Sequence, residues 1–284
     1  MSDRPFRVVL FGGAVAHSRS GEIFCALAHV GGPAVEHEAI VSTPERLAAD
    51  LDRLRQGEWD AAHVTVPLKV VAAGLADDLD LSARKSGVVN TLVRGADGRL
   101  TGFETDGAGF VRGLDAFPEE VRPGPGAPVV ILGAGGAARA VANALSWTGS
   151  PVVVVSRDPQ RAEWIDKSGF KGVGWTDRRL AEEVARADLI VQATPVGMAP
   201  DVERQPPLPA ALITAGRRVV DLIYNPWQTR FLEQARRRGA AAINGWPMLV
   251  HQAALALTLW RDASAGALLL EAGRLVETRD PGRP

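Results

Sequence analysis

Cysteine is nearly absent from this chain, since Cys25 is the only one among 284 residues. A lone cysteine excludes an internal disulfide, which fits a reducing compartment. Its neighbours Phe24 and Ala26 predict that Cys25 is a buried, small apolar residue. Long hydrophobic runs are also missing: no segment reaches the roughly 18 apolar residues of a membrane-spanning helix, and the apolar run within residues 1–13 is too short for a signal peptide. We therefore expect a cytoplasmic protein with no membrane partner.

An excess of charge of either sign is lacking as well. The chain has 32 Lys and Arg against 33 Asp and Glu, so it has no basic field for nucleic acid. Its five histidines lack the spacing to cysteine or acids that a metal site needs, and we expect most of them at the surface or at a pocket rim. With 46% apolar and 23% charged residues, the chain is typical of a globular protein with one large or two modest domains. The expected partner is a small molecule, and the expected state is a monomer or homodimer.

A glycine-rich turn near the middle of the chain is the most informative single motif. Val129–Leu132 is a continuous apolar run, as a strand buried on both faces requires. Gly133 and Gly135 follow directly, and Ala138 takes the third place of the G-x-G-x-x-G pattern at the start of a predicted helix. Such a turn forms an anion site for a pyrophosphate. A second apolar run at 152–155 completes a βαβ unit, which favours a bound dinucleotide over a turn without a ligand.

Strand and helix patterns alternate along the chain, which predicts an α/β fold with parallel sheets. A loop with four prolines and two glycines, at 118–128, lies between the two halves. Residues 86–94 and 100–104 are predicted to form a hairpin. The other expected strands are 7–11, 35–41, 61–66, 129–132, 152–155, 188–192, 219–223 and 240–243, and the expected helices are 21–30, 45–55, one from 68, one ending at 114, 248–260 and 264–276.

Polar side chains stand at the ends of the expected strands of the first half, where ligands bind in open α/β sheets. Lys69 and Asp106 are able to form a charge pair beside a reacting alcohol or ketone, with the lysine moving a proton and the aspartate orienting it. A solvated lysine and a turn aspartate explain the same residues, and spacing alone does not decide between these interpretations. The other members of this group are Ser18, Ser20, Thr65 and Asn90, a mixture that suits a small polyhydroxylated acid.

Eight motifs, taken in chain order, resemble those of the shikimate dehydrogenase family. The first half contains His17-Ser-Arg-Ser20, Val64-Thr-Val-Pro-Leu-Lys69, Gly87-Val-Val-Asn-Thr-Leu92 and Thr105-Asp-Gly107. The second half contains Gly133-Ala-Gly-Gly-Ala-Ala-Arg139, Ala193-Thr-Pro-Val-Gly-Met198, Asp221-Leu-Ile-Tyr-Asn-Pro226 and Asn244-Gly-Trp-Pro-Met-Leu-Val-His-Gln252. The resemblance extends from residue 7 to residue 260, and the ordered set is far more specific than any one motif.

The resemblance implies reversible, nicotinamide-dependent reduction of 3-dehydroshikimate to shikimate. It implies two lobes: a substrate-binding catalytic domain at 1–113, completed by C-terminal helices at 246–284 that return to it, and a Rossmann-type dinucleotide-binding domain at 114–245. The implied catalytic pair is Lys69 and Asp106. The implied substrate-binding residues are Ser18 and Ser20 for the carboxylate, Thr65, Asn90 and Gln252 for ring hydroxyls, and Tyr224 near the substrate.

The residues after the second strand of the glycine-turn unit bear on the choice of cofactor. The segment 156–161 resembles the family's NADP-type pattern, in which Arg157 and Arg161 would hold a 2′-phosphate. Asp158 would repel that phosphate or bond the hydroxyls of NAD, and two surface arginines at a helix start remain another explanation. NADP is favoured and NAD stays possible. The implied cofactor-binding residues are Gly133, Ala134, Gly135, Gly136, Ala137, Ser156, Arg157, Asp158, Arg161, Thr194, Pro195, Met198 and Gly245.

Three residues depart from the family's motifs in addition to Ser156 and Asp158 of the cofactor segment. His63 stands where asparagine is usual, Glu104 stands where the motif Asn-Thr-Asp usually begins, and Gly21 stands where proline is common. One hypothesis is that His63 and Glu104 line an altered pocket for quinate or aminoshikimate, since an extra carboxylate suits an ammonium and raises the pKa of one acid. Neutral change at a pocket rim is the other. The alternatives to shikimate are therefore a quinate or aminoshikimate dehydrogenase of a specialised pathway and a non-catalytic nucleotide-binding regulator, which would need neither Lys69 nor Asp106.

Overall fold

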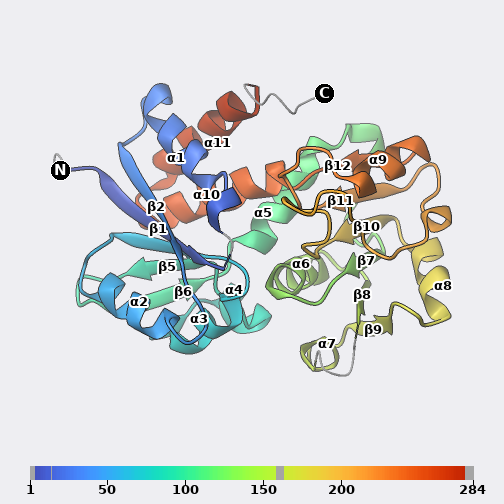
Figure 1. Cartoon of the computed structure of the whole chain (residues 1–284), viewed down its shortest axis with the longest axis horizontal. Helices are drawn as coiled ribbons and strands as arrows, with labels where there is room; N and C mark the ends of the chain where they lie inside the picture. Colours follow the sequence, from blue (N-terminus) through green and yellow to red (C-terminus); the bar gives the residue numbers. More distant parts are fainter. Residues whose placement is uncertain (1–3, 14, 158–162, 279–284) are drawn as a thin grey trace. The chain divides into compact units, whose positions relative to one another are not determined.

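The computed structural model describes residues 4–13, 15–157 and 163–278 (Figure 1). The described chain forms two compact units, one from residues 4–109 with 249–278 and the other from residues 110–248. The boundaries between the units fall inside α5 (Asp106–Gly113) and α10 (Trp246–Trp260). Within the described residues, no helix has the length and apolar content to cross a bilayer.

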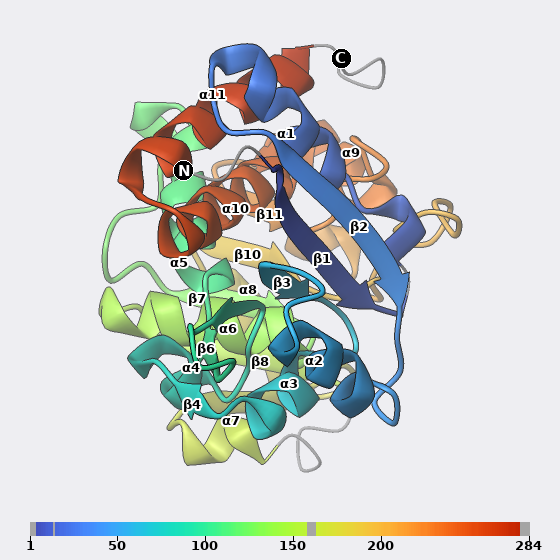
Figure 2. The same ribbon diagram turned by 90° about the vertical axis from the view of Figure 1, so that its left-hand side faces the viewer.

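The first unit contains a six-stranded sheet in the order β2-β1-β3-β5-β6-β4 (Figure 2). β1 pairs in parallel with β2 and β3, whereas β5 pairs antiparallel with both β3 and β6. β5 and β6 form the hairpin that the sequence predicts, since the tight turn at Gly98, with φ +83°, joins them directly and such a turn connects antiparallel strands. The strands are β1 (Phe6–Gly12), β2 (Val35–Val41), β3 (Ala61–Val64), β4 (Asp78–Leu79), β5 (Thr91–Arg94) and β6 (Leu100–Phe103).

Helices cover both faces of this sheet (Figure 2). On one face, Leu51 of α2 packs in a core with Phe11 and Trp59. On the other face α11 packs against α1, and Trp260 of α10 donates its indole N–H to the carbonyl of Leu92 at 3.0 Å. The C-terminal helices thus complete the unit that the N-terminal segment begins. The remaining helices are α1 (Ser20–Leu27), α2 (Leu47–Arg55), α3 (Lys69–Leu75), α4 (Leu81–Ser86) and α11 (Ala263–Thr278), with 3₁₀ turns at Val15–His17 and Ala28–Val30.

Ser86 does not begin a β segment, as the sequence predicted, but ends helix α4. The helix starts at a good N-cap, because the Asp80 carboxylate accepts the N–H groups of Ser82 at 3.2 Å and Ala83 at 2.9 Å. It stops at Gly87, whose φ of +68° is the left-handed conformation that ends helices. The helix caps at Asp80 and Gly87 therefore determine the conformation of Ser86, and the apolar residues after Gly87 do not extend the strand back to it.

Cys25 is exposed, so the expectation of a buried cysteine is also wrong. In α1, Ile23, Phe24, Ala26 and Leu27 are buried. These residues form the inward face of a helix, and the helical repeat turns position 25 toward solvent. Apolar neighbours in sequence therefore did not imply burial.

The second unit contains six strands, all parallel, in the order β12-β11-β10-β7-β8-β9. Counted along the chain from β7, this is the doubly wound order 3-2-1-4-5-6 of dinucleotide-binding domains. The order reverses between β7 and β10, so the ligand-binding switch point of this fold lies at the carboxyl ends of these two strands. The elements are β7 (Val129–Leu132), β8 (Val152–Ser156), β9 (Lys171–Gly174), β10 (Leu189–Gln192), β11 (Arg218–Asp221), β12 (Ala241–Ile243), α6 (Gly136–Trp147), α7 (Trp164–Lys167), α8 (Arg179–Arg186) and α9 (Arg230–Arg237), with 3₁₀ turns at Leu114–Ala116, Glu119–Val121 and Ala210–Leu212.

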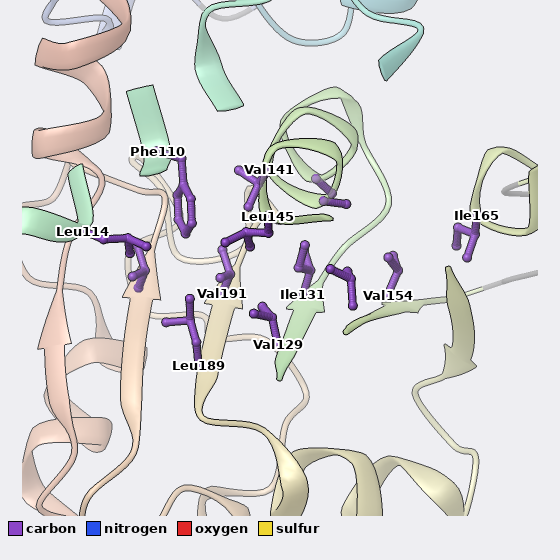
Figure 3. Close-up of a cluster of buried hydrophobic side chains, with 14 of the residues drawn as sticks. Phe110, Leu114, Val129, Ile131, Val141, Leu145, Val154, Ile165, Leu189 and Val191 are labelled. Carbon is purple, nitrogen blue, oxygen red and sulfur yellow. The ribbon is translucent and has the colours of Figure 1, made fainter. Parts of the chain in front are cut away.

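An apolar core holds α6 on this sheet. Figure 3 shows Val141 and Leu145 of α6 beside Ile131 of β7 and Val191 of β10. Alternate residues of the same strands are buried in a second core on the opposite face, which is why their sequences are continuous apolar runs. β9 was not predicted, because only Val173 of its four residues is buried.

Candidate active site

Two charged side chains of the first unit meet at the start of two helices. Lys69 is the first residue of α3, shortly after β3, and Asp106 is the first residue of α5, shortly after β6. The Lys69 ammonium donates to Asp106 Oδ2 in an ion pair, and the two side chains are only 12% and 8% exposed. Charges shielded from water interact more strongly than charges in solution. The structure thus brings together the two residues whose pairing the sequence left open.

A network of amides and hydroxyls lies in the same unit. Asn90 Nδ2 donates to Thr105 Oγ1 at 2.9 Å and to Gln252 Oε1 at 3.3 Å, and Asn90 Oδ1 accepts the Thr105 backbone N–H at 2.8 Å. All three residues are buried, and Gln252 is supplied by α10. The structure thus joins two predicted residues that are far apart in sequence. It adds Thr105, which the sequence analysis did not single out although it begins the motif that contains Asp106.

The loop after β1 carries the two predicted serines. Ser18 Oγ and Ser20 Oγ are 2.8 Å apart, and Ser20 begins α1. Thr65 lies beside the end of β1, where its backbone N–H donates to the Phe11 carbonyl at 2.8 Å. A Cβ on Gly12 would come within 2.3 Å of Thr65 Cγ2, so the close approach of these two strand ends requires glycine. Paired hydroxyls of this kind are able to donate hydrogen bonds to an anion.

Glu104 is buried close to the ion pair. Its carboxylate accepts the Gly107 N–H at 2.9 Å through Oε1 and at 3.2 Å through Oε2, which satisfies an amide in the first turn of α5. Burial and then the charge of Asp106 raise the pKa of Glu104 to about 8, against the opposing effects of the Gly107 N–H and the Lys69 ammonium. Glu104 therefore holds a proton through much of the neutral range.

Glu104→Gln should be more stable than the wild type at alkaline pH. The pKa of this carboxyl is about 8 in the folded chain against an ordinary 4.5, so the folded state binds the proton more tightly and loses stability as pH rises between these values, by at most about 1.4 kcal/mol per pH unit. Glutamine keeps an oxygen for the Gly107 N–H and does not ionise. Urea unfolding should show a larger advantage of the variant at pH 9 than at pH 5. The exposed Glu182→Gln serves as the control, and an advantage of Glu104→Gln that is equal at both pH values would contradict the assignment.

His63 lies in the core, not at the surface or a pocket rim, where we expected most histidines. It is 4% exposed, its Nδ1 lies 3.3 Å from the Asn90 carbonyl oxygen, and its ring centroid is 4.6 Å from that of Trp260. Burial lowers the pKa of His63 to about 3, so the imidazole is neutral at physiological pH. In the described part of the chain, no three His, Cys, Asp or Glu side chains are grouped to hold a metal ion.

The glycine turn of the second unit is shaped for a close backbone approach. Gly133 has φ +116°, and a Cβ there would come within 3.1 Å of the Ala193 carbonyl, so only glycine fits without strain. Gly135 is the N-cap of α6, so no side chain of the N-cap residue accepts a hydrogen bond from the first N–H groups of this helix. A Cβ placed on Gly135 would have no atom within 4 Å apart from those of its chain neighbours. The positive end of a 12-residue helix thus borders open space. These residues fit a pyrophosphate, which such a helix start binds through backbone N–H groups.

Gln192, which the sequence analysis missed, fixes the loop after β10. It is fully buried, its Oε1 accepts the Thr194 N–H at 2.6 Å and hydroxyl at 2.8 Å, and its Nε2 donates to the Val196 carbonyl at 3.2 Å. In the same loop the Met198 N–H donates to the Pro195 carbonyl at 3.2 Å. Since β10 neighbours β7, three predicted cofactor residues of this loop lie at the switch point. A glutamine that ends an apolar strand was the available signal.

The other predicted residues of the second unit differ in exposure. Ser156 ends β8 and is buried, with no hydrogen-bond partner for its hydroxyl among the described residues, whereas Arg157 is exposed. Asp158 and Arg161 lie outside the described residues. A Cβ on Gly245 would come within 2.1 Å of the Leu222 carbonyl oxygen, so this position also requires glycine. Tyr224 lies in the loop after β11. The backbone carbonyl of Ala134 accepts a hydrogen bond from the Trp164 indole N–H at 3.3 Å. Gly136 and Ala137 are the first two residues of α6.

Two family profiles match the chain. Residues 10–92 match the shikimate dehydrogenase substrate binding domain, and residues 128–222 match the NADP oxidoreductase, coenzyme F420-dependent family. The first match contains Ser18, Ser20, Thr65, Lys69 and Asn90, and the second contains the glycine turn. The matches thus fall on the two parts of the chain in which the substrate and cofactor residues were predicted.

Individual relatives match over nearly the whole chain. Shikimate dehydrogenase (NADP(+)) of Moorella thermoacetica is 40% identical over 274 residues, which cover 93% of this chain and 90% of the relative. The crystal structure of shikimate 5-dehydrogenase from Thermus thermophilus in complex with NADP(H) and shikimate superposes with a TM-score of 0.80 at 37% identity, covering 95% of this chain and 99% of that one. The ligand-free 5-ketofructose reductase of Gluconobacter sp. strain CHM43 has a TM-score of 0.76 at 29% identity, covering 97% and 100%. The predicted fold class is confirmed, and the chain belongs to the shikimate dehydrogenase family.

Proposed function

We propose that this protein is an NADP-dependent shikimate dehydrogenase, which reversibly reduces 3-dehydroshikimate to shikimate. The observation that carries the proposal is the shielded Lys69–Asp106 ion pair, in a chain whose relatives are named for this reaction and this cofactor. Interconversion of a ketone and an alcohol moves one proton on or off the oxygen, and a positioned ammonium is suited to that transfer.

The first unit supplies groups for each part of the substrate. Ser18 and Ser20 hold the carboxylate, and their hydroxyls are already 2.8 Å apart. Thr65, Asn90 and Gln252 hold the ring hydroxyls, and the bond between the two amides keeps Asn90 and Gln252 in place. Tyr224 of the second unit stays a predicted substrate contact.

Lys69 carries the proton. In the direction of reduction its ammonium Nζ gives a proton to the ketone oxygen as negative charge develops there, and its positive charge stabilises that oxygen. In the direction of oxidation the Lys69 amine takes the proton from the alcohol. Asp106 accepts the lysine's hydrogen bond and orients it. NADP, when bound, supplies or accepts the hydride.

The second unit holds the cofactor in this proposal. The turn from Gly133 to Ala137 binds the pyrophosphate, and Arg157 and Arg161 bind the 2′-phosphate. The open space at Gly135 and the Ser156 hydroxyl, which has no hydrogen-bond partner within the described part of the chain, support this placement. The remaining proposed contacts are Asp158, Thr194, Pro195, Met198 and Gly245.

The proposal is tested by following the absorbance of reduced nicotinamide with shikimate and either NADP⁺ or NAD⁺. We expect kcat/KM with NADP⁺ to exceed that with NAD⁺ by at least about tenfold, which corresponds to about 1.4 kcal/mol of discrimination. The same assay with quinate and aminoshikimate tests the altered pocket, and a clear preference for shikimate would overturn that alternative. Tight binding of NADP without turnover of any of the three acids would instead indicate a regulator.

The proposal also includes a cytoplasmic enzyme that acts as a monomer or homodimer and has no nucleic-acid partner. It is supported by the net charge of −1 and the single cysteine. Size-exclusion chromatography with light scattering measures the oligomeric state directly.

A further inference from the structure

A histidine of the edge strand β2 lies against the serine pair. His37 Nε2 is 3.4 Å from Ser20 Oγ, which is in turn 2.8 Å from Ser18 Oγ. The imidazole stacks on the ring of Phe24 in α1, with 5.6 Å between centroids and 17° between planes. This stacking holds the ring so that one of its nitrogens faces the two hydroxyls. His37 is not among the site residues predicted from the sequence.

Gly21 makes room for this imidazole. A Cβ at position 21 would lie 3.1 Å from His37 Nδ1 and 3.7 Å from both Cγ and Cε1. Any side chain there, including the proline that is common in the family's motif, would therefore press on the histidine ring. The departure at position 21, which the sequence left unexplained, is thus accounted for by the ring beside it.

The surroundings of His37 keep its ring uncharged when no ligand is present. Burial lowers the pKa of His37 to about 4. Its neighbours along β2 point to the opposite face of the sheet, because side chains alternate along a strand. The charged and titratable groups around it in the described structure are His63 beyond Phe24, the Arg19–Glu22 ion pair at the start of α1, Glu36 and Glu38 of β2, and Arg7 and Glu58, which line a cavity together with His37.

We propose that His37 is a third member of the carboxylate site and takes up one proton from solvent when the substrate carboxylate binds to Ser18 and Ser20. This inference rests on the proposed function, which places a carboxylate at the serine pair. An anion within hydrogen-bond distance favours imidazolium over imidazole, so Nε2 then donates a charge-assisted hydrogen bond to the carboxylate. The proton returns to solvent when the carboxylate leaves.

Two properties follow from this arrangement. The site selects an acid over the same molecule with a neutral group in place of the carboxylate, because only the anion stabilises the added proton. Binding of the acid also weakens as pH rises, because the neutral ring must take its proton from a solution that holds fewer of them. A serine pair alone would give a weaker preference and no such dependence on pH.

Isothermal titration of shikimate into the protein at pH 6, in two buffers of different ionisation enthalpy, measures the protons taken up. We expect uptake by the wild type and markedly less by His37→Gln, which keeps an N–H donor but does not titrate. At pH 6, KM for shikimate should be about tenfold higher in His37→Gln than in the wild type, which is the usual effect of losing a charge-assisted hydrogen bond. At pH 8.5 the difference in KM should be smaller. At both pH values kcat of the variant should stay within about twofold of the wild-type value. The preference for shikimate over its methyl ester should fall in parallel.

Gly21→Ala provides a second route to the same site without changing the histidine. Its Cβ should displace the ring and raise KM for shikimate in the wild type, but it should have little effect when added to His37→Gln. If wild type and His37→Gln take up equal numbers of protons and favour the acid over the ester equally, the role of His37 is overturned while the proposed function stands. If the wild type neither binds nor oxidises shikimate, both proposals fail.

Discussion

Replacing Lys69 by glutamine should lower kcat by about 1,000-fold while the chain stays folded. A positioned acid or base typically contributes 10²–10⁴ to the rate, and the ammonium also stabilises the charge that develops on the substrate oxygen. Glutamine still offers an N–H to Asp106, so the buried carboxylate keeps a hydrogen-bond donor. Steady-state kinetics with shikimate and NADP⁺ give kcat and KM, and thermal unfolding of the same samples reports the fold.

A lysine of the second unit provides the matched control. Lys171 also forms an ion pair, with Glu183 at 2.5 Å, but its side chain is 45% exposed. Lys171→Gln should leave kcat within about twofold, because this lysine has no part in the proposed reaction and the buried Glu183 keeps Arg186 as a partner at 3.5 Å.

The double variant tests whether Lys69 and Asp106 act as a unit. Asp106→Asn removes the group that orients the ammonium, so it should also lower kcat. The double variant Lys69→Gln with Asp106→Asn should be little slower than the slower single variant, because the effects of residues that act together are not additive. A folded Lys69→Gln enzyme with more than about a tenth of the wild-type kcat would contradict the proposed proton transfer.

The sequence predicts elements well where their pattern reflects burial. β7 is apolar along its length, and β10 is apolar up to Gln192, because both faces of their sheet are covered, and both strands were predicted. β4 and β9 were not, because neither is a continuous apolar run and neighbouring strands and helices determine their conformation. The antiparallel pair of β5 and β6 was predicted as a hairpin around Gly98, whereas the antiparallel pairing of β3 with β5, which are separated along the chain by α3, β4 and α4, was not predicted.

The sequence also identifies site residues more easily than it identifies their partners. The Lys69–Asp106 pair was named from strand ends, but only the fold shows that water is largely excluded from it. His37 was missed because its partners Ser20 and Phe24 come from another element of the fold, whereas Gln192 bonds within its own loop and was missed although it ends an apolar strand. The fold also moves His63 from an expected rim position into the core.

Replacing Gly135 by valine should raise KM for NADP⁺ by about 100-fold, which corresponds to a loss of about 2.7 kcal/mol of binding. Gly135 has φ −79° and ψ −173°, a conformation open to any residue, and a Cβ there meets nothing within 4 Å. The chain should therefore fold normally, and the branched side chain would occupy the space into which the pyrophosphate approaches the start of α6. Fluorescence titration with NADPH measures the loss of binding directly.

Two other glycines separate a blocked cofactor site from general damage. Gly124→Val, in the same unit, also places a side chain in open space, and it should change neither NADPH binding nor stability. Gly133→Ala should both destabilise the fold and weaken NADPH binding. Gly133 has φ +116°, which is strained for alanine, and a Cβ there would collide with the carbonyl of Ala193. A Gly135→Val protein that binds NADPH as tightly as the wild type would place the pyrophosphate elsewhere. The effect belongs to the cofactor site alone if KM for shikimate, measured at saturating NADP⁺, stays within about threefold of the wild type.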